Sequence, residues 1–190
     1  MTSKTYDKIL QTAHRLFVKQ GYTATSMRQL AEQAGIGKAT IYHHFPDKQA
    51  IVTALLKESS VRMDETLRLI QEQQDSRLRI QAAAMESIDF FFDSADLIQV
   101  VRREVADARE AMQAGLMNFF QQYMALLAEA IQCGIQQGLF RPVDPEDAAR
   151  VLLTMIQGTF AMSYLSGKRP ESPNQTIAAM LDVFFHGIDA

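Results

Sequence analysis

The spacing of the apolar residues constrains the fold most, because these residues recur every three or four positions along nearly the whole chain of 190 residues. Ile9, Ala13, Leu16 and Phe17 show the pattern near the amino terminus. Almost no segment has the alternation of apolar and polar residues that marks a half-buried strand. The spacing therefore predicts an all-α protein, long enough to bury a core without help from a metal or a disulfide.

Helix start and stop signals divide the first part of the chain into four helices. Glycines at positions 21 and 35 suit the left-handed position that follows a helix. Ser26 and Gln29 fit a capping box, and Asp47 is a good cap after Pro46. The expected helices end at Gly21 and then span 26–34, 38–45 and 47–74.

The remainder also has helical spacing, interrupted by three breaks. "DSAD" at 93–96, "GLFRPVDPED" at 138–147 and "SGKRPESPN" at 166–174 are rich in residues that favour turns. The expected helices are 76–93, 96–106, 107–137, 145–165 and 174–188. The sequence thus predicts a small helical head over residues 1–50 and a helical bundle over 51–190.

Charge is distributed unevenly between the two ends of the chain. Up to Lys57 there are eight lysines and arginines against three acids, whereas the whole chain carries a net charge of −3. A basic head on an acidic body favours a polyanionic partner that approaches from one side. The alternative is ordinary scatter of charge.

The segment "GIGKATIYHHFPDK" at 35–48 has the spacing of a helix-turn-helix connection, because three residues separate two short helices. At 100° per residue, Ile41 and Phe45 share the buried face of the second of these helices. Ala39, Thr40, Tyr42 and His43 then point outward. A small side chain with hydroxyl and imidazole groups beside it is what a recognition helix presents to the major groove.

Cations and helix amino termini near this segment predict contacts with phosphates. If about five phosphates are neutralised per subunit, a dimer has a salt slope of roughly −9. The alternative is a small helical subdomain with a solvated basic face. The expected DNA contacts are Thr25, Ser26, Arg28, Lys38, Ala39, Thr40, Tyr42, His43 and Lys48.

The stretch "GYTATSMRQLAEQAGIGKATIYHHFPDKQAIVTALL" resembles the DNA-binding segment of TetR-family transcriptional regulators, and the resemblance covers residues 6–57. "TIYHHFPDK" is its most specific part. The resemblance implies a dimer of helical subunits, each with a divergent ligand-binding domain, whose DNA is released by an effector. Gly37 departs from the serine often found there, so the recognition helix lacks that side-chain cap. The resemblance carries over Thr25, Arg28, Lys38, Thr40, Tyr42, His43 and Lys48 as DNA contacts.

Aromatic residues and methionines in the body suggest a pocket for an apolar or aromatic effector. Phe90, Phe91 and Phe92 sweep about 200° of a helix, so one neighbouring helix cannot cover all three. The alternative for each residue is plain core packing. The expected pocket residues are Met85, Phe91, Phe92, Met112, Phe119, Phe120, Tyr123 and Met155.

The last two helices carry wider apolar stripes than one bundle face requires. Pairing them across a twofold axis buries the excess and places two recognition helices about 34 Å apart. The alternative is burial within one subunit. The expected interface residues are Met155, Thr159, Phe160, Ile177, Met180, Leu181 and Phe184.

Other classes of protein lack support in the sequence. We expect no cofactor, no metal site and no catalytic residues, because neither a phosphate-binding loop nor a nucleophile with a base is recognisable, and the adjacent His43 and His44 cannot easily chelate one ion. With a polar amino terminus, no apolar run of ~18 residues and a single cysteine, Cys133, we expect a cytoplasmic protein. An adaptor that binds only proteins conflicts with the basic head. The sequence favours a repressor, released from a palindromic operator by a small, largely apolar effector.

Overall fold

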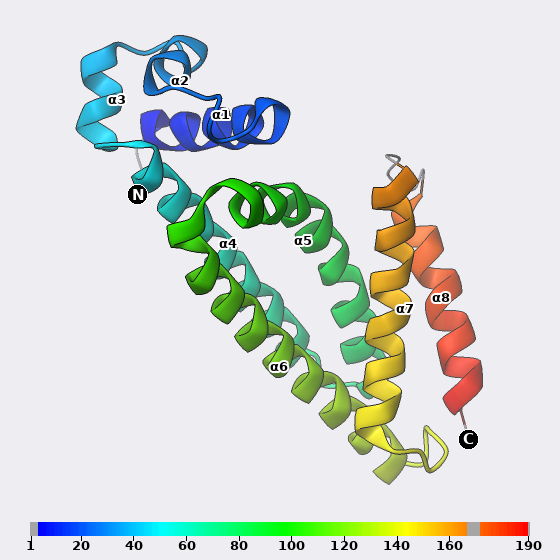
Figure 1. Ribbon diagram of the computed structural model, residues 1–190. Helices are drawn as coiled ribbons and strands as arrows, with labels where there is room; N and C mark the ends of the chain where they lie inside the picture. Colours follow the sequence, from blue (N-terminus) through cyan, green and yellow to red (C-terminus); the bar gives the residue numbers. More distant parts are fainter. Residues whose placement is uncertain (1–3, 167–171, 190) are drawn as a thin grey trace. The chain divides into compact units, whose positions relative to one another are not determined.

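The structure, a computed structural model, describes the backbone of residues 4–166 and 172–189, and within them all side chains except those of 88–93, 160 and 162–166. Apart from one isolated bridge between Phe140 and Asp189, the regular structure in these ranges is α-helical, so the all-α prediction is confirmed. The helices are α1 (Lys4–Gln20), α2 (Met27–Gln33), α3 (Lys38–His44), α4 (Lys48–Glu72), α5 (Ser76–Glu104), α6 (Ala106–Gln136), α7 (Pro145–Ser166) and α8 (Pro173–Ile188) (Figure 1).

Seven of these helices lie close to their predicted positions, but the predicted break at 93–96 is wrong. α5 continues from Ser76 to Glu104 without interruption. The segment contains no glycine or proline, and aspartate and serine cost a helix interior only about 0.5 kcal/mol each. Leu97, Val100 and Val101 in the following turns are buried, so this part of the helix is stabilised by packing that outweighs the weak local preference.

The chain packs into two compact units, each made of two stretches of the sequence. The first unit contains residues 1–61 and 93–116, and the second contains 62–92 and 117–190. α4, α5 and α6 each contribute to both units. In the first unit one hydrophobic cluster joins Phe17 of α1, Leu30 of α2 and Ile41 of α3 to Val101 and Val105 near the end of α5. The corner between α5 and α6 is therefore part of the core of the helix-turn-helix head.

The second unit is held by a buried polar group and by packing around the turn after α6. The hydroxyl of Tyr123 donates to the carbonyl oxygen of Ala83 and accepts a hydrogen bond from Ser87, both at 2.8 Å. Burial raises the pKa of this hydroxyl. The Phe140 ring lies so close to Gly134 that a Cβ there would come within 2.2 Å of a ring carbon. Glycine is thus required for this close approach.

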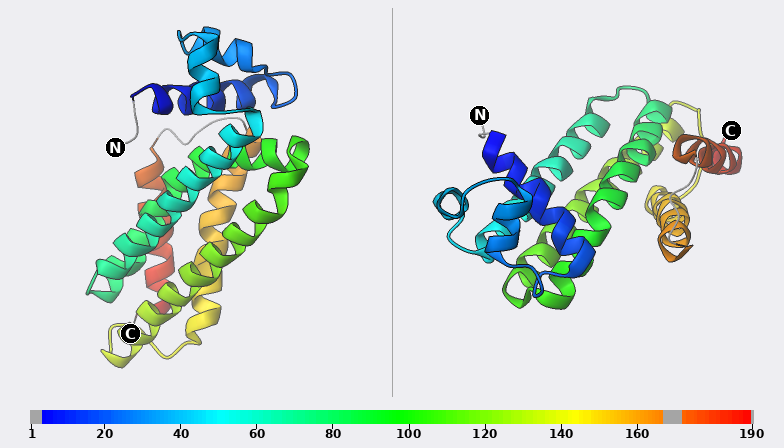
Figure 2. Two further views of the ribbon diagram at one scale, coloured as in Figure 1. Left: turned by 90° about the vertical axis from the view of Figure 1, so that its left-hand side faces the viewer. Right: turned by 90° about the horizontal axis from the view of Figure 1, so that it is seen from above.

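α7 and α8 run side by side in all views (Figure 1 and Figure 2). Among the described residues, no helix is both long enough and apolar enough to cross a bilayer.

Candidate nucleic-acid interface

α2 and α3 are joined by a tight turn at residues 35–37 and are fixed to the first unit by apolar side chains. Gly35 has a φ of +61°, which glycine adopts without strain, and the N–H of Ile36 donates to the carbonyl oxygen of Ala31 at 3.0 Å. Ile41 is fully buried, and Phe45 is almost so. These anchors fix which side of α3 faces outward.

The outward side of α3 carries the residues that the helical spacing predicts. Ala39, Thr40, Tyr42 and His43 are all exposed, and Tyr42 keeps 45% of its surface accessible. Lys38, at the first position of the helix, is exposed as well. The predicted orientation of the helix is confirmed, and their contact with DNA stays a prediction.

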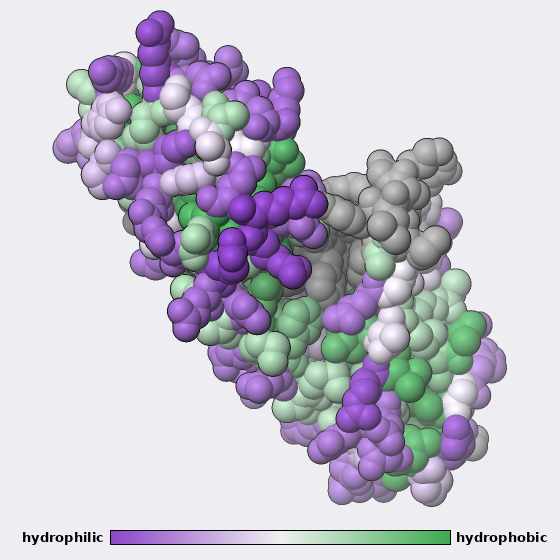
Figure 3. All heavy atoms as spheres, viewed as in Figure 1, coloured by the Kyte–Doolittle hydropathy of each residue, from purple (hydrophilic) through white to green (hydrophobic). Residues whose placement is uncertain are grey.

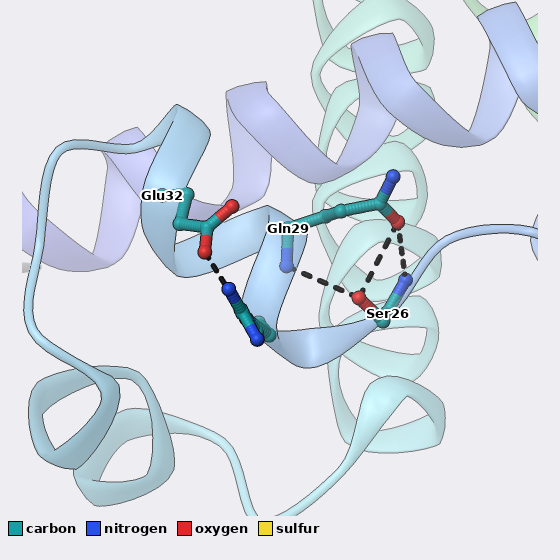
Figure 4. Close-up of polar contacts among 4 residues, drawn as sticks. Ser26, Gln29 and Glu32 are labelled. Atoms are coloured by element: carbon teal, nitrogen blue, oxygen red, sulfur yellow. Dashed lines mark hydrogen bonds and ion pairs between the residues drawn. The ribbon is translucent and has the colours of Figure 1, made fainter.

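The start of α2 has the predicted capping box (Figure 4). The N–H of Gln29 donates to Ser26 Oγ at 3.1 Å, and the N–H of Ser26 donates to Gln29 Oε1 at 3.0 Å. Arg28, on the next exposed position, donates from Nε to Glu32 at 2.8 Å, and this hydrogen bond raises the pKa of its guanidinium. The first turn of α2 is therefore rigid, with a cation and a hydroxyl at its surface.

The structure places Thr25 differently from the other predicted contacts, because its side chain is turned inward. Its exposed fraction is 1%. The hydroxyl donates to the carbonyl oxygen of Gly21 at 2.8 Å and accepts a hydrogen bond from Gln20 at 3.1 Å. Thr25 thus closes the end of α1, and its predicted contact with DNA stays a prediction.

Lys48 is also engaged within the first unit. Its ammonium donates to the carbonyl oxygen of Tyr22 at 2.6 Å and lies 4.3 Å from the centre of the Tyr22 ring. Desolvation by burial lowers its pKa, while Glu104 opposes that shift. Lys48 holds the turn at residues 21–26, which we call the α1–α2 turn, and its predicted contact with a phosphate stays a prediction.

Glu104, the last residue of α5, is a further residue of this region that was not predicted. One of its carboxylate oxygens accepts the N–H of Thr23, a residue of the α1–α2 turn, at 2.7 Å. This hydrogen bond is the main cause that lowers the pKa of Glu104. Its partner lies 81 positions away in the sequence, so no local pattern identifies it.

The predicted ligand-binding residues do not gather around one described hollow. Met85 lines a hollow of about 510 Å³ in the second unit, together with Arg77, Ile177, Leu181 and Phe185. Met112 is buried in the core of the first unit, whereas Phe119 and Tyr123 are buried in the second. Phe120 is partly buried beside Phe119, with 5.6 Å between ring centres. The side chains of Phe91 and Phe92 lie outside the described residues.

The predicted interface residues on α7 and α8 point in more than one direction. Ile177 and Leu181 are buried and line the hollow next to Met85, so they are covered within one subunit. Met155 and Phe184 instead line a second hollow of about 530 Å³ with Val151 and Val183. Val151 and Val183, which the prediction omitted, are 55% and 65% exposed. Met180 is nearly buried, Thr159 is partly buried, and the side chain of Phe160 lies outside the described residues.

Comparison with known proteins decides the family. Residues 9–55 match the family described as bacterial regulatory proteins of the tetR family, and residues 73–188 match the tetracyclin repressor-like carboxy-terminal domain. The chain belongs to the TetR family. The resemblance carried by residues 6–57 is therefore confirmed, and so is a helical body behind a helix-turn-helix head. The protein is accordingly a DNA-binding transcriptional regulator by family.

Individual TetR-family relatives agree over almost the whole chain. An uncharacterised helix-turn-helix regulator, YhgD of Bacillus subtilis, is 27% identical over 93% of this chain and 92% of its own length. A transcriptional regulator of Saccharomonospora viridis, solved with choline, is 25% identical and covers both chains fully with a TM-score of 0.73. AibR, solved with isovaleryl coenzyme A and operator DNA, is 26% identical over 96% of this chain and 98% of its own, with a TM-score of 0.65. The expected partners of this chain, namely operator DNA, a second subunit and a small effector, are those of such regulators.

Proposed function

We propose that this TetR-family protein is a ligand-responsive repressor, which binds a palindromic operator as a homodimer and is released by a small, largely apolar effector. The observation that carries the proposal is the outward face of α3, where five exposed polar or small residues lie above the buried anchors Ile41 and Phe45. A helix held in this way can enter the major groove without disturbing its own core.

The proposed contacts divide by chemistry. Ala39 is small enough to approach a thymine methyl, and Thr40, Tyr42 and His43 can hydrogen-bond to base edges or phosphates. Lys38, Arg28 and Ser26 are exposed beside them and suit phosphate oxygens, which fix the register of the protein. Thr25 and Lys48 support the α1–α2 turn, so their effect on DNA binding is indirect in the described arrangement.

The outer face of α7 and α8 supports the homodimer. On the face seen in Figure 3, hydrophobic residues gather over these two helices. Val151 and Val183 remain largely exposed around a hollow that Met155 and Phe184 also line. An apolar face of this kind is stabilised when the same face of a second subunit covers it.

The effector proposal rests on the second unit and on the relatives. AibR is solved with isovaleryl coenzyme A and the Saccharomonospora regulator with choline, so these two ligands differ in charge and size. In this chain Ile177, Leu181 and Phe185 line the hollow beside Met85, and polar side chains, Arg77, Gln81, Asn174, Asp182, His186 and Asp189, line the rest of it. The apolar part of this lining suits the largely apolar body of a ligand.

Duplex selection tests the proposal. Full-length protein would be used to select duplexes from a random library, and the enriched duplex would then be titrated in a mobility-shift assay. We expect a palindromic sequence bound by two chains. Failure to enrich any sequence would contradict sequence-specific binding.

Reciprocity tests the role of the effector. If a compound weakens operator binding a hundredfold, the coupling free energy is about 2.7 kcal/mol, and the operator must weaken binding of that compound equally. Calorimetric titration of the compound with and without the selected duplex measures both sides. Equal affinity in the two titrations would contradict the scheme.

The same purified protein can be used to test two other classes of function, an enzyme and an adaptor that binds only proteins. An enzyme would turn over candidate substrates, and an adaptor for proteins alone would show no affinity for DNA that depends on salt. We propose regulation rather than catalysis, exercised in the cytoplasm, where bacterial operators lie.

A further inference from the structure

The α1–α2 turn connects α1 to the capped start of α2, and it is short enough that its backbone decides where α2 begins. Gly21 ends α1 with a φ of +91°, a conformation that other residues rarely adopt. Ser26, at the other end of the turn, is the cap of α2. Any change in the backbone between these two residues therefore moves the first turn of α2.

Glu104 holds this turn from the end of α5. Its Oε2 accepts the N–H of Thr23 at 2.7 Å, and its Oε1 lies close to Gly21, where an added Cβ would come within 2.8 Å of it. The absence of a side chain at Gly21 thus gives the carboxylate room to reach the backbone of the turn. A hydrogen bond from a backbone N–H to a charged carboxylate is stronger than one between neutral groups.

Lys48 holds the same turn from the start of α4. Its ammonium donates to the carbonyl oxygen of Tyr22 at 2.6 Å, so the turn is bonded through an N–H on one residue and a C=O on the residue before it. The charges of Lys48 and Glu104 attract each other across the turn. Two helices outside the helix-turn-helix thereby restrain the segment that sets the start of α2.

We propose that Glu104 is a positioning residue for DNA binding, which fixes the α1–α2 turn by accepting the N–H of Thr23 and so sets how α2 is presented to DNA. The inference rests on the proposed function. Glu104 ends a continuous helix whose earlier residue Met85 lines the hollow proposed for an effector.

The decisive experiment compares Glu104→Ala with Glu110→Ala in the full-length protein. Glu110 is an exposed acid of α6 in the same unit, so both variants lose one negative charge. The probes are the duplex selected with the unmodified protein and a scrambled duplex of the same composition. We expect Glu104→Ala to bind the selected duplex about tenfold more weakly than Glu110→Ala, while both bind the scrambled duplex alike.

Two further variants separate positioning from folding and from charge. Glu104→Gln keeps an oxygen that can accept the N–H, so it is expected to stay within about twofold of the unmodified protein. Glu104→Asp keeps the charge but is one methylene shorter, so it is expected to lose affinity for the selected duplex as Glu104→Ala does. The amide signal of Thr23 in an NMR spectrum should move in the Ala and Asp variants and not in Glu110→Ala.

The outcomes distinguish this inference from the proposed function. If the unmodified protein binds no duplex, both fail. If it binds, but Glu104→Ala or the correctly folded Glu104→Asp matches Glu110→Ala on both duplexes, the positioning role alone is overturned.

Discussion

Polar residues of the same type occupy two different environments in the head. Thr40 and Lys38 face outward on α3, whereas Thr25 and Lys48 bond to the backbone of the α1–α2 turn. The first pair can contact DNA directly. The second pair holds the turn that leads into α2.

Lys38 and Thr40 should affect DNA binding in different ways. Lys38→Ala removes one exposed cation per subunit, so it should weaken binding to all duplexes and flatten the salt slope by about 1 per subunit. Thr40→Val removes a hydroxyl that can read a base, so it should change the preferred sequence. Lys57→Ala, an exposed lysine of α4, is the control. If both variants keep the affinity, the salt slope and the preferred sequence of the unmodified protein, α3 is not part of the DNA interface.

The contribution of Glu104 to stability should depend on pH. The pKa of this carboxyl is lowered in the folded protein, mainly by the N–H of Thr23. Its stabilising effect is therefore present above the pKa of an unfolded glutamate, about 4.3, and is lost as the pH falls through the lowered value. In denaturant unfolding at pH 7, the unmodified protein should have a higher free energy of unfolding than Glu104→Gln, and this difference should shrink as the pH is lowered into the acid range. A difference of equal size at pH 7 and in acid would contradict the charged hydrogen bond.

The sequence predicts the outward residues of α3 well, because helical geometry alone fixes the direction of each side chain around Ile41. It does not predict how the side chains of Thr25 and Lys48 are oriented. Their orientation depends on the left-handed backbone at Gly21 and on a turn whose N–H is bonded to Glu104, which lies far away in the sequence. A turn has no regular repeat of side-chain directions, so such contacts cannot be predicted from the sequence of the turn alone.

Helix boundaries were predictable wherever the local chemistry is strong. Ser26 caps α2, Gly35 ends it, and the side chain of Asp47 accepts the N–H of Ala50 at the start of α4. The predicted break at 93–96 failed because serine and aspartate oppose a helix only weakly, and the packing of α5 outweighs them. Local signals thus decide helix ends more reliably than they decide helix continuity.

Removing the capping box should destabilise the head. Ser26→Ala deletes the oxygen that accepts the N–H of Gln29, which should lower the free energy of unfolding by about 1 kcal/mol. Ser60→Ala, at an exposed position within α4, is the matched control and should be neutral or slightly stabilising. Thermal unfolding followed by circular dichroism measures both. Equal melting temperatures for Ser26→Ala and the unmodified protein would show that the capping box does not contribute to stability.

At the scale of the whole molecule, the proposed function requires two subunits, since one α3 would contact one half of a palindrome. The wide apolar stripes of α7 and α8 predicted a dimer face. Their inward members Ile177 and Leu181 are covered within the subunit, however, and exposed Val151 and Val183 mark the outer face. A sequence reveals how apolar a helix is, but its neighbours decide which side is left uncovered.

Val183→Asp should separate the subunits, because it places a charge at the most exposed large apolar side chain of α8. Sedimentation should show monomers, and binding to the selected duplex should fall steeply. Leu78→Asp, an exposed apolar residue of α5, is the control and should remain dimeric. A Val183→Asp protein that sediments as a dimer would place the interface elsewhere.

The salt dependence of binding to the selected duplex tests the central claim most directly. The unmodified full-length protein would be titrated into the labelled duplex at several salt concentrations, with the stoichiometry measured in dilute buffer. The account predicts two chains per duplex and a slope of log affinity against log salt of roughly −9, with weaker binding to a scrambled duplex. No binding in dilute buffer, or an affinity that does not change with salt, would contradict it.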